Sequence, residues 1–227
     1  MLKPIPELFL LDSNIHYLNH GSFGACPRPV FQVFQEWQFK LEQNPIDYFT
    51  RQLKGLFTHE LGGPLEEART RLAEFVNADA KGLIFVPNVT VALNAIAHSI
   101  MLDPGDEVVT TNHEYGTILE TWTQKCVGSS AILKQVPLDF PLGSQDEMVH
   151  HFWKAITPQT KVILMSHITS ATALLLPVEE ICKKARAAGI ITIIDGAHAV
   201  GQIPLDLNVM SADFYTSNCH KWLLTPK

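Results

Sequence analysis

The sequence has little basic character. Of its 227 residues, 17 are Lys or Arg and 23 are Asp or Glu, which gives a formal net charge of −6 at pH 7. Domains that bind nucleic acid usually carry a clustered excess of Lys and Arg, because contacts to phosphate dominate their affinity. The composition therefore argues against nucleic acid as a partner.

Long apolar runs and paired cysteines are also missing. No run approaches the roughly 20 apolar residues that a membrane-spanning helix needs. Prolines interrupt the apolar part of the N-terminal segment, and no signal-peptide cleavage pattern follows. The four cysteines are scattered, with no C-x-x-C spacing, at Cys26, Cys126, Cys182 and Cys219. We expect a cytoplasmic protein with reduced thiols and no membrane partner.

Several nucleotide and hydrolase motifs are absent as well. No G-x-G-x-x-G sequence follows a predicted strand, which argues against a nicotinamide-binding Rossmann-type oxidoreductase, the natural structural rival. There is no Walker lysine motif and no G-x-S-x-G elbow, so phosphoryl transfer and α/β-hydrolase chemistry are weakly supported.

Short apolar runs alternate with amphipathic stretches along the chain, and hydrophobic residues make up 46% of it. The runs predict strands at 83–86, 107–111, 130–136, 161–165, 190–194 and 213–217. The periodic stretches predict helices at 30–41, 65–76, 91–101, 118–126 and 178–188, and one that starts near Gln145. This alternation predicts an α/β fold, a three-layer α/β/α sandwich with a mostly parallel sheet.

The most informative stretch runs from the buried strand 190–194 to Lys221. Asp195 falls where that strand ends, and Lys221 follows the next predicted strand, 221 − 195 = 26 residues later. In open α/β sheets, ligands bind outside the carboxyl ends of strands. Pyridoxal 5'-phosphate (PLP) requires both groups, a lysine for its Schiff base and an acid that faces its ring nitrogen.

Polar clusters follow four other predicted strands. They are Asn88-Val89-Thr90, His113 to Tyr115, Ser166 to Ser170 and Asn218 to Lys221. Asn88 is a good helix N-cap, which places Thr90 in the first turn of a helix. The free N–H groups of that turn could bind an anion, or Thr90 could be an ordinary helix-start residue with no ligand. Tyr115 could stack on a planar cofactor or could be an ordinary half-buried tyrosine. Five clusters converging on one sheet edge predict a ligand cleft.

The segment from His16 to Gly24 is rich in glycine and polar residues. Such a segment is either a surface loop or a loop whose backbone approaches a ligand closely. Two glycines alone do not decide between these alternatives.

Together these clusters resemble the class V family of PLP-dependent aminotransferases, of fold type I, in which cysteine desulfurases and kynureninase are relatives. The resemblance is most specific in Asp195-Gly196-Ala197-His198 and in Asn218-Cys219-His220-Lys221-Trp222. The opening Tyr17 to Gly24, the Asn44-Pro45 turn and the His-Lys-Trp triplet look like the isopenicillin N epimerase-like branch.

The resemblance implies a role for each motif residue. Lys221 is the Schiff-base lysine and proton shuttle, and Asp195 pairs with the ring nitrogen. His198 and Ser170 bind the phenolic oxygen of the cofactor, and Tyr115 stacks on its ring, with His113 as a competitor for that role. The phosphate is held by Val89, Thr90, Asn218 and His220.

The resemblance also implies an enzyme that acts on a small amino acid, by epimerisation or related chemistry at the α-carbon. A cysteine desulfurase or C–S lyase and an aminotransferase are alternatives, and a non-enzymatic fragment or degenerate homologue is another. We expect a homodimer with shared active sites. Residues 1–60 are expected to pack on the cofactor domain and the dimer partner, and 61–227 to form the PLP-binding large domain. The C-terminal small domain, with the arginine that binds the substrate carboxylate, is expected beyond Lys227.

Overall fold

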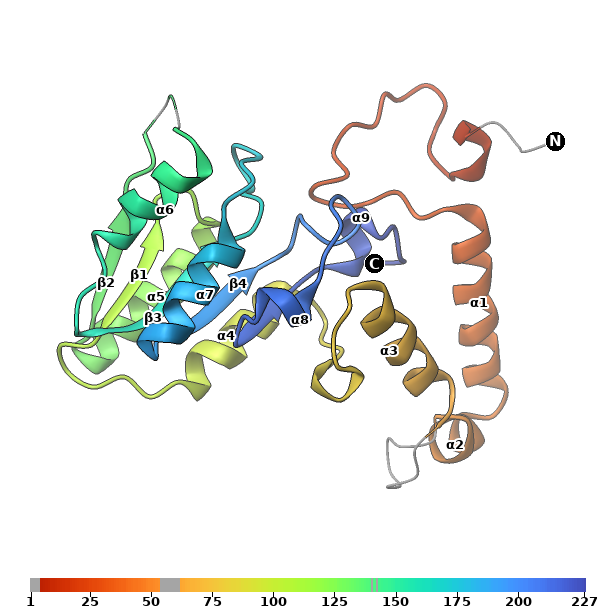
Figure 1. Cartoon of the computed structure of the whole chain (residues 1–227). Coiled ribbons are helices and arrows are strands. Elements are labelled where there is room, and N and C mark those ends of the chain that lie inside the picture. Colours follow the sequence, from red (N-terminus) through yellow and green to blue (C-terminus); the bar gives the residue numbers. More distant parts are fainter. Residues whose placement is uncertain (1–4, 54–61, 140, 142) are drawn as a thin grey trace. The chain divides into compact units, whose positions relative to one another are not determined.

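The computed structural model describes residues 5–53, 62–139, 141 and 143–227 (Figure 1). The chain divides into two compact units, and each is described by itself. The terminal unit comprises Met1–Phe85 and Cys219–Lys227, and the sheet unit comprises Val86–Asn218. The predicted boundary near residue 60 stays a prediction, and residues 1–4 and 54–60 of that segment lie outside the described residues.

The sheet unit is built on five parallel strands in the order β2-β1-β3-β4-β5. The strands are β1 (Glu107–Thr111), β2 (Ile132–Val136), β3 (Thr160–Ser166), β4 (Ile191–Asp195) and β5 (Phe214–Thr216). Five of the six predicted strands are thus confirmed. Because every pair is parallel, the residues that follow β1, β3, β4 and β5 lie along one side of the sheet, which we call the carboxyl edge.

Helices cover both faces of this sheet. They are α4 (Val89–Ser99), α5 (Gly116–Ser129), α6 (Gln145–Trp153), α7 (Val178–Ala188) and the short α8 (Leu207–Met210). Successive strand residues point to opposite faces. Val108 packs in one core with residues of α4 and α5, and Val109 packs in a second core with residues of α6 and α7. This confirms the predicted three-layer arrangement.

The predicted strand at 83–86 is wrong. Leu83 has an extended backbone, but within the described part of the chain none of these four residues pairs with a strand, and Ile84 is 81% exposed. The helix that follows begins at Val89, where the side chain of Asn88 accepts a hydrogen bond from the Val91 N–H at 3.0 Å. Asn88 is therefore the N-cap that the sequence predicts.

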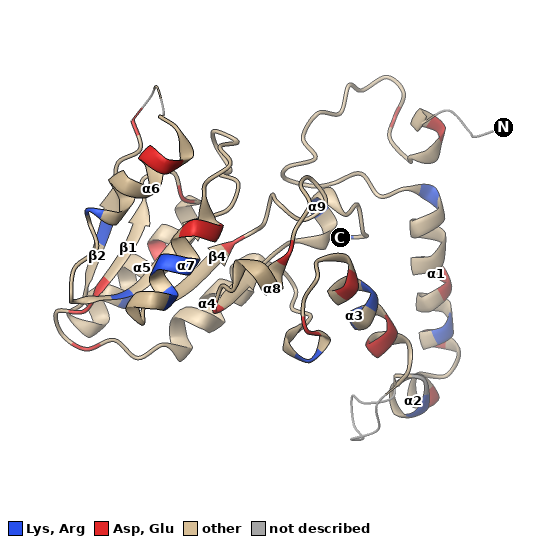
Figure 2. Cartoon of the chain, viewed as in Figure 1, with Lys and Arg blue, Asp and Glu red and all other residues tan. Residues whose placement is uncertain are grey.

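The terminal unit is mainly helical in its described part. It contains η1 (Ile5–Leu8), α1 (Arg28–Gln43), α2 (Pro45–Asp47), the π-helical η2 (Tyr48–Gln52), α3 (Pro64–Phe75), η3 (Ala80–Gly82) and α9 (Cys219–Trp222). The predicted helices 30–41 and 65–76 correspond to α1 and α3. Acidic and basic residues are interspersed along both of these helices (Figure 2). Among the described residues, none of the helices combines the length and apolarity that crossing a membrane requires.

Candidate active site

Asp195 is the last residue of β4 (Ile191–Asp195), and this position places it at the carboxyl edge. The side chain of Asp195 is 6% exposed, and its Oδ1 accepts a hydrogen bond from the Ala197 N–H at 2.9 Å. A Cβ on the intervening Gly196 would lie 2.3 Å from ring atoms of Tyr215. Only glycine therefore fits the turn that carries the chain past this buried carboxylate.

Asn218 joins the end of β5 to the start of α4. Its Oδ1 accepts a hydrogen bond from the Val89 N–H at 3.1 Å, and both residues are buried. This bond brings Val89 and Asn218 together, and Thr90 follows Val89 in the first turn of α4. The amide oxygen of Asn218 faces the Val89 N–H, and its amide nitrogen is a hydrogen-bond donor at the same helix start. The N-terminus of α4 favours negative charge at the same place.

The structure distinguishes the two aromatic candidates that follow β1. Nε2 of His113 lies 2.9 Å from the Leu138 carbonyl oxygen, and Nδ1 lies 3.2 Å from Thr172 Oγ1. Both ring nitrogens of His113 thus contact other parts of the protein. Tyr115 immediately precedes α5 and is 49% exposed. Of the two rings, that of Tyr115 is the more available to a ligand.

Ser170 and His198 lie in the loops that follow the neighbouring strands β3 and β4. Ser170 is exposed, in a loop whose sides are joined by an antiparallel bridge between Ile168 and Leu175. His198 is partly buried, and its carbonyl oxygen accepts a hydrogen bond from Gln202 Nε2 at 2.5 Å. Both residues therefore belong to the carboxyl edge.

Glu114 is a site residue that the sequence analysis missed. Its carboxyl group accepts hydrogen bonds from the Ser166 N–H (2.8 Å), Ser166 Oγ (2.5 Å) and Thr111 Oγ1 (2.6 Å). Burial raises the pKa of Glu114 to about 7, because these hydrogen bonds only partly offset desolvation and the nearby charge of Asp195 raises the pKa further. The only signal in the sequence is a carboxylate three residues after the end of a predicted strand.

His167 and Tyr215 form a second buried pair that the sequence did not indicate. His167 Nδ1 lies 3.0 Å from the Tyr215 hydroxyl, and the two rings meet edge to face. Burial lowers the pKa of His167 to about 4 and raises that of Tyr215, to which the charge of Asp195 also contributes. Both side chains are therefore neutral around pH 7.

In the terminal unit, α9 carries His220 and Lys221. The Gly24 N–H donates to the His220 carbonyl oxygen at 2.9 Å, and Lys227 Nζ donates to the Gly24 carbonyl oxygen at 2.8 Å. A Cβ on Gly24 would lie 1.8 Å from the Lys221 carbonyl oxygen. The close backbone approach of this loop is therefore to α9. Burial and the charges of Lys221 and Lys227 lower the pKa of His220.

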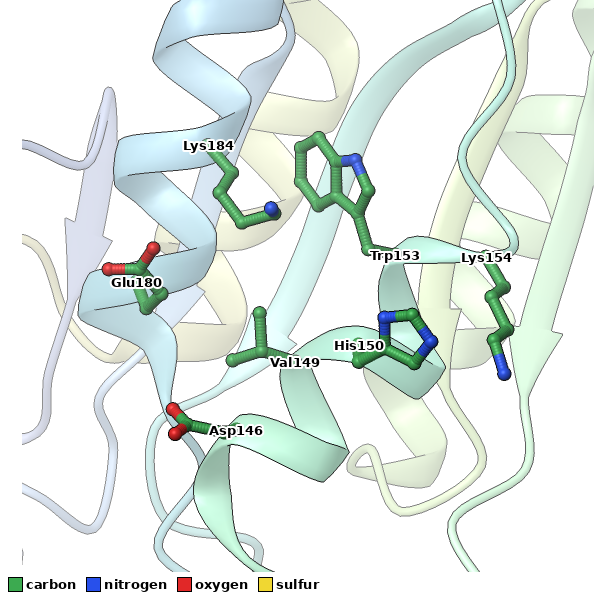
Figure 3. A pocket seen from close by; sticks show the side chains of 7 residues that line it. All are labelled: Asp146, Val149, His150, Trp153, Lys154, Glu180 and Lys184. Carbon is green, nitrogen blue, oxygen red and sulfur yellow. The ribbon is translucent and has the colours of Figure 1, made fainter.

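A separate hollow of about 430 Å³ lies between α6 and α7 (Figure 3). Trp153 and Lys184 face each other across it, with Lys184 Nζ 4.9 Å from the centre of the indole ring. None of the residues predicted from the sequence to form the site lines this hollow.

A search of family models matches residues 25–227 to "Aminotransferase class-V". Isopenicillin N epimerase of Amycolatopsis lactamdurans is 36% identical over 223 residues, which cover 97% of this chain and 54% of that protein. A probable chloroplastic L-cysteine desulfhydrase of Arabidopsis thaliana is 28% identical over 230 residues, covering 95% and 46%. The chain thus spans about half the length of the curated relatives it matches.

Solved structures share the fold. A mutant of C-DES with glycine covalently linked to its PLP cofactor matches with a TM-score of 0.82 and 22% identity. The match covers 98% of this chain and 57% of that one. This similarity confirms the predicted α/β architecture of the aminotransferase type.

Proposed function

Because the chain belongs to the class-V aminotransferase family, we propose that it is a PLP-dependent enzyme that acts on a small amino acid. The observation that carries the proposal is a buried carboxylate, Asp195, on the same sheet edge as the anion-favouring start of α4. When bound, PLP supplies an electron sink for the negative charge that develops at the substrate α-carbon. The relatives named isopenicillin N epimerase and the fold shared with a PLP-containing structure support this cofactor.

The donor set of the carboxyl edge fits a flat aromatic ring with an anionic tail. Asp195 would bind the ring nitrogen. A carboxylate with little access to water strongly favours the protonated, cationic form of a ring nitrogen beside it. The hydrogen bond from the Ala197 N–H supports this role, because it fixes the carboxylate and stabilises its charge.

The start of α4 would hold the phosphate. Thr90 offers a hydroxyl and a backbone N–H in the first helical turn, and Asn218 offers its amide nitrogen. The Val89 N–H already donates to Asn218, so we assign Val89 the role of fixing that amide beside the phosphate. His220 would complete the phosphate site.

Three further side chains would orient the ring. We propose that Tyr115 stacks on its face, because the nitrogens of the competing His113 contact Leu138 and Thr172. Ser170 and His198 would donate to the phenolic oxygen from the loops after β3 and β4.

Lys221 would bind the cofactor covalently and then move the proton of the substrate α-carbon. Its amine removes that proton, and the reaction depends on where the proton is returned. Return to the opposite face gives epimerisation, return to the cofactor side leads to transamination, and loss of a β-substituent gives C–S cleavage. We favour epimerisation, because the isopenicillin N epimerase of A. lactamdurans is 36% identical to this chain. The desulfhydrase relative keeps C–S cleavage as the second candidate.

The assembly and location are parts of the same proposal. We propose a homodimer with shared active sites in the cytoplasm, with residues 61–227 forming part of the cofactor domain. The family match leaves the nicotinamide alternative without support.

The test of cofactor binding uses the purified chain mixed with PLP. We expect a visible absorption band, and borohydride reduction should fix the cofactor onto a peptide that contains Lys221. Lys221→Ala should abolish the attachment. Lys227→Ala, which removes the other described lysine of that segment, should leave it intact. A protein that stays colourless with added PLP would overturn the proposal.

The test of reaction type is a screen of amino acids in deuterated water. An epimerase should exchange the α-proton and lose optical activity while the amino acid concentration stays constant. A C–S lyase should instead release sulfide from cysteine, or cysteine persulfide from cystine, and an aminotransferase should require an oxo acid. Sulfide release without α-carbon inversion would replace epimerisation by the second candidate.

A further inference from the structure

Two buried glutamates flank β1, and their surroundings differ. Glu107, at the amino end, pairs with Lys134 Nζ at 2.5 Å and accepts hydrogen bonds from Thr157 and Thr160. Burial alone would raise the pKa of Glu107, but these partners outweigh it and the pKa lies below its usual value. Glu107 is therefore a charged residue that is compensated locally, on the side of the sheet away from the candidate site.

Glu114 follows the carboxyl end of the same strand and is 9% exposed. Its described hydrogen-bond partners are the hydroxyl of Thr111 and the N–H and hydroxyl of Ser166, and none of these is a cation. One carboxyl group thereby joins the ends of β1 and β3. In the sheet register, Ser166 is the direct neighbour of Asp195 on β4. A chain of three strand ends thus runs from Glu114 through Ser166 to Asp195.

Two carboxylates at such a buried edge repel each other, and one of them favours its protonated form. Asp195 has a backbone N–H donor at 2.9 Å, which stabilises its charged form. The charge of Asp195 in turn raises the pKa of Glu114. His167, directly after β3, and Tyr215, in β5, come from the strands on either side of β4. Both stay neutral around pH 7, because burial lowers the pKa of His167 and raises that of Tyr215.

We propose that Glu114 is a positioning residue of the candidate site. It joins β1 to β3 beside Asp195, and it holds a proton, so that Asp195 is the charged member of the pair. This inference rests on the proposed function only for the consequence of that charge, which is cofactor binding. The hydrogen-bonded pair itself is a property of the protein without a ligand.

The first test is the pH dependence of thermal unfolding of the cofactor-free protein. The pKa of Glu114 is raised to about 7 on folding, so the folded state holds an extra proton below that pH. The stability that this proton confers is complete below the ordinary glutamate pKa and is lost as the pH rises through about 7. Relative to Glu114→Gln, the wild-type melting temperature should fall by about 3 to 6 °C between pH 6 and pH 8.

Glutamine is a suitable replacement because it has the shape of glutamate and is neutral, like the protonated acid. Its carbonyl oxygen can accept from Ser166 and its amide can donate to Thr111. The matched control is Glu107→Gln, which should lower the melting temperature but keep the wild-type slope between pH 6 and pH 8.

The second test measures PLP affinity at pH 6 and pH 8. A cationic ring beside Asp195 reduces the repulsion felt by Glu114, so binding should release the Glu114 proton. Wild-type affinity should then rise with pH relative to Glu114→Gln, by up to about tenfold for each unit by which the Glu114 pKa falls. A purely structural role predicts a constant ratio of affinities at both pH values, and that result would overturn the proposal.

The outcomes separate the two proposals. If wild type binds no PLP, the proposed function fails, while the unfolding curves still test Glu114. If wild type binds PLP but the Gln variant has the same pH slopes, the role of Glu114 fails and the function stands. If the Gln variant does not fold, infrared spectra of wild type decide, because a protonated carboxyl band should be present at pH 6 and lost by pH 8.

Discussion

Because Gly24 has no side chain, its loop can approach the backbone of α9 closely. The Gly24 N–H bonds to the His220 carbonyl oxygen, and a Cβ would meet the Lys221 carbonyl oxygen at 1.8 Å. The sequence alone is compatible with a loop on the surface and with a loop that approaches a ligand. It could not decide, because the contact joins segments that are nearly the whole chain apart. Tyr17 supports the loop by donating from its hydroxyl to the Phe23 carbonyl oxygen.

Gly24→Ala tests this contact. Backbone atoms cannot rotate away as a side chain can, so the terminal unit should lose about 1 to 3 kcal/mol of unfolding free energy. Chemical denaturation followed by tryptophan fluorescence, to which Trp37 and Trp222 of this unit contribute, measures the loss. Gly82→Ala is the control in the same unit, because its added Cβ meets nothing within 4 Å, and it should be nearly neutral. Equal effects of the two substitutions would show that the contact is not formed.

At the scale of helices and strands, sequence patterns predict some elements with their bounds and fail for others. The strand 107–111 and the helix 178–188 were predicted with the bounds that β1 and α7 have. The first is rich in β-branched residues and lies between a turn and a polar cluster, and the second is a charged, periodic stretch that ends at a glycine. The run 83–86 is more apolar than 107–111, yet it forms no strand with the residues that the structure describes. A strand requires a neighbour to hydrogen-bond, and composition does not reveal whether one is available.

The sequence predicts those site residues that lie at the ends of predictable strands. Asp195 and Asn218 were found because each follows a strand. Glu114 follows one too, but its function depends on the Ser166 N–H, 52 residues away in the chain. The order of strands in the sheet determines which strands are neighbours, and no local sequence pattern predicts this order.

Replacing each of the two adjacent threonines at the end of β1 by valine should change the stability in opposite directions. Thr110 is fully buried, and its hydroxyl has no hydrogen-bond partner among the described residues. Thr110→Val removes an unpaired polar group, and we expect a gain of about 1 kcal/mol. Thr111 donates to Glu114 and accepts from the His113 N–H, so Thr111→Val should cost about 1 to 3 kcal/mol. Urea denaturation of both variants measures the difference, and a loss in both would contradict the assignment at Thr110.

At the scale of the whole molecule, both large hydrophobic cores lie inside the sheet unit. Their buried members run from Val89 to Met210, within Val86–Asn218. The terminal unit is instead assembled from both ends of the chain.

A fragment of residues 86–218 should therefore fold alone. It keeps all five strands and the buried Trp122, so we expect a cooperative unfolding transition and blue-shifted tryptophan emission. A complementary fragment of residues 1–85 should not unfold cooperatively, because α9 is missing from it. A non-cooperative 86–218 fragment with red-shifted emission would mean that its stability depends on the terminal unit.

The bond between Lys227 Nζ and the Gly24 carbonyl oxygen joins positions 203 apart. During synthesis on the ribosome, the first 85 residues must wait for α9, which emerges 134 residues after Phe85. At translation rates of about 5 to 20 residues per second, that delay is roughly 7 to 27 s. The sheet unit can fold within this time, whereas the N-terminal helices remain exposed to chaperones and proteases until α9 has left the exit tunnel.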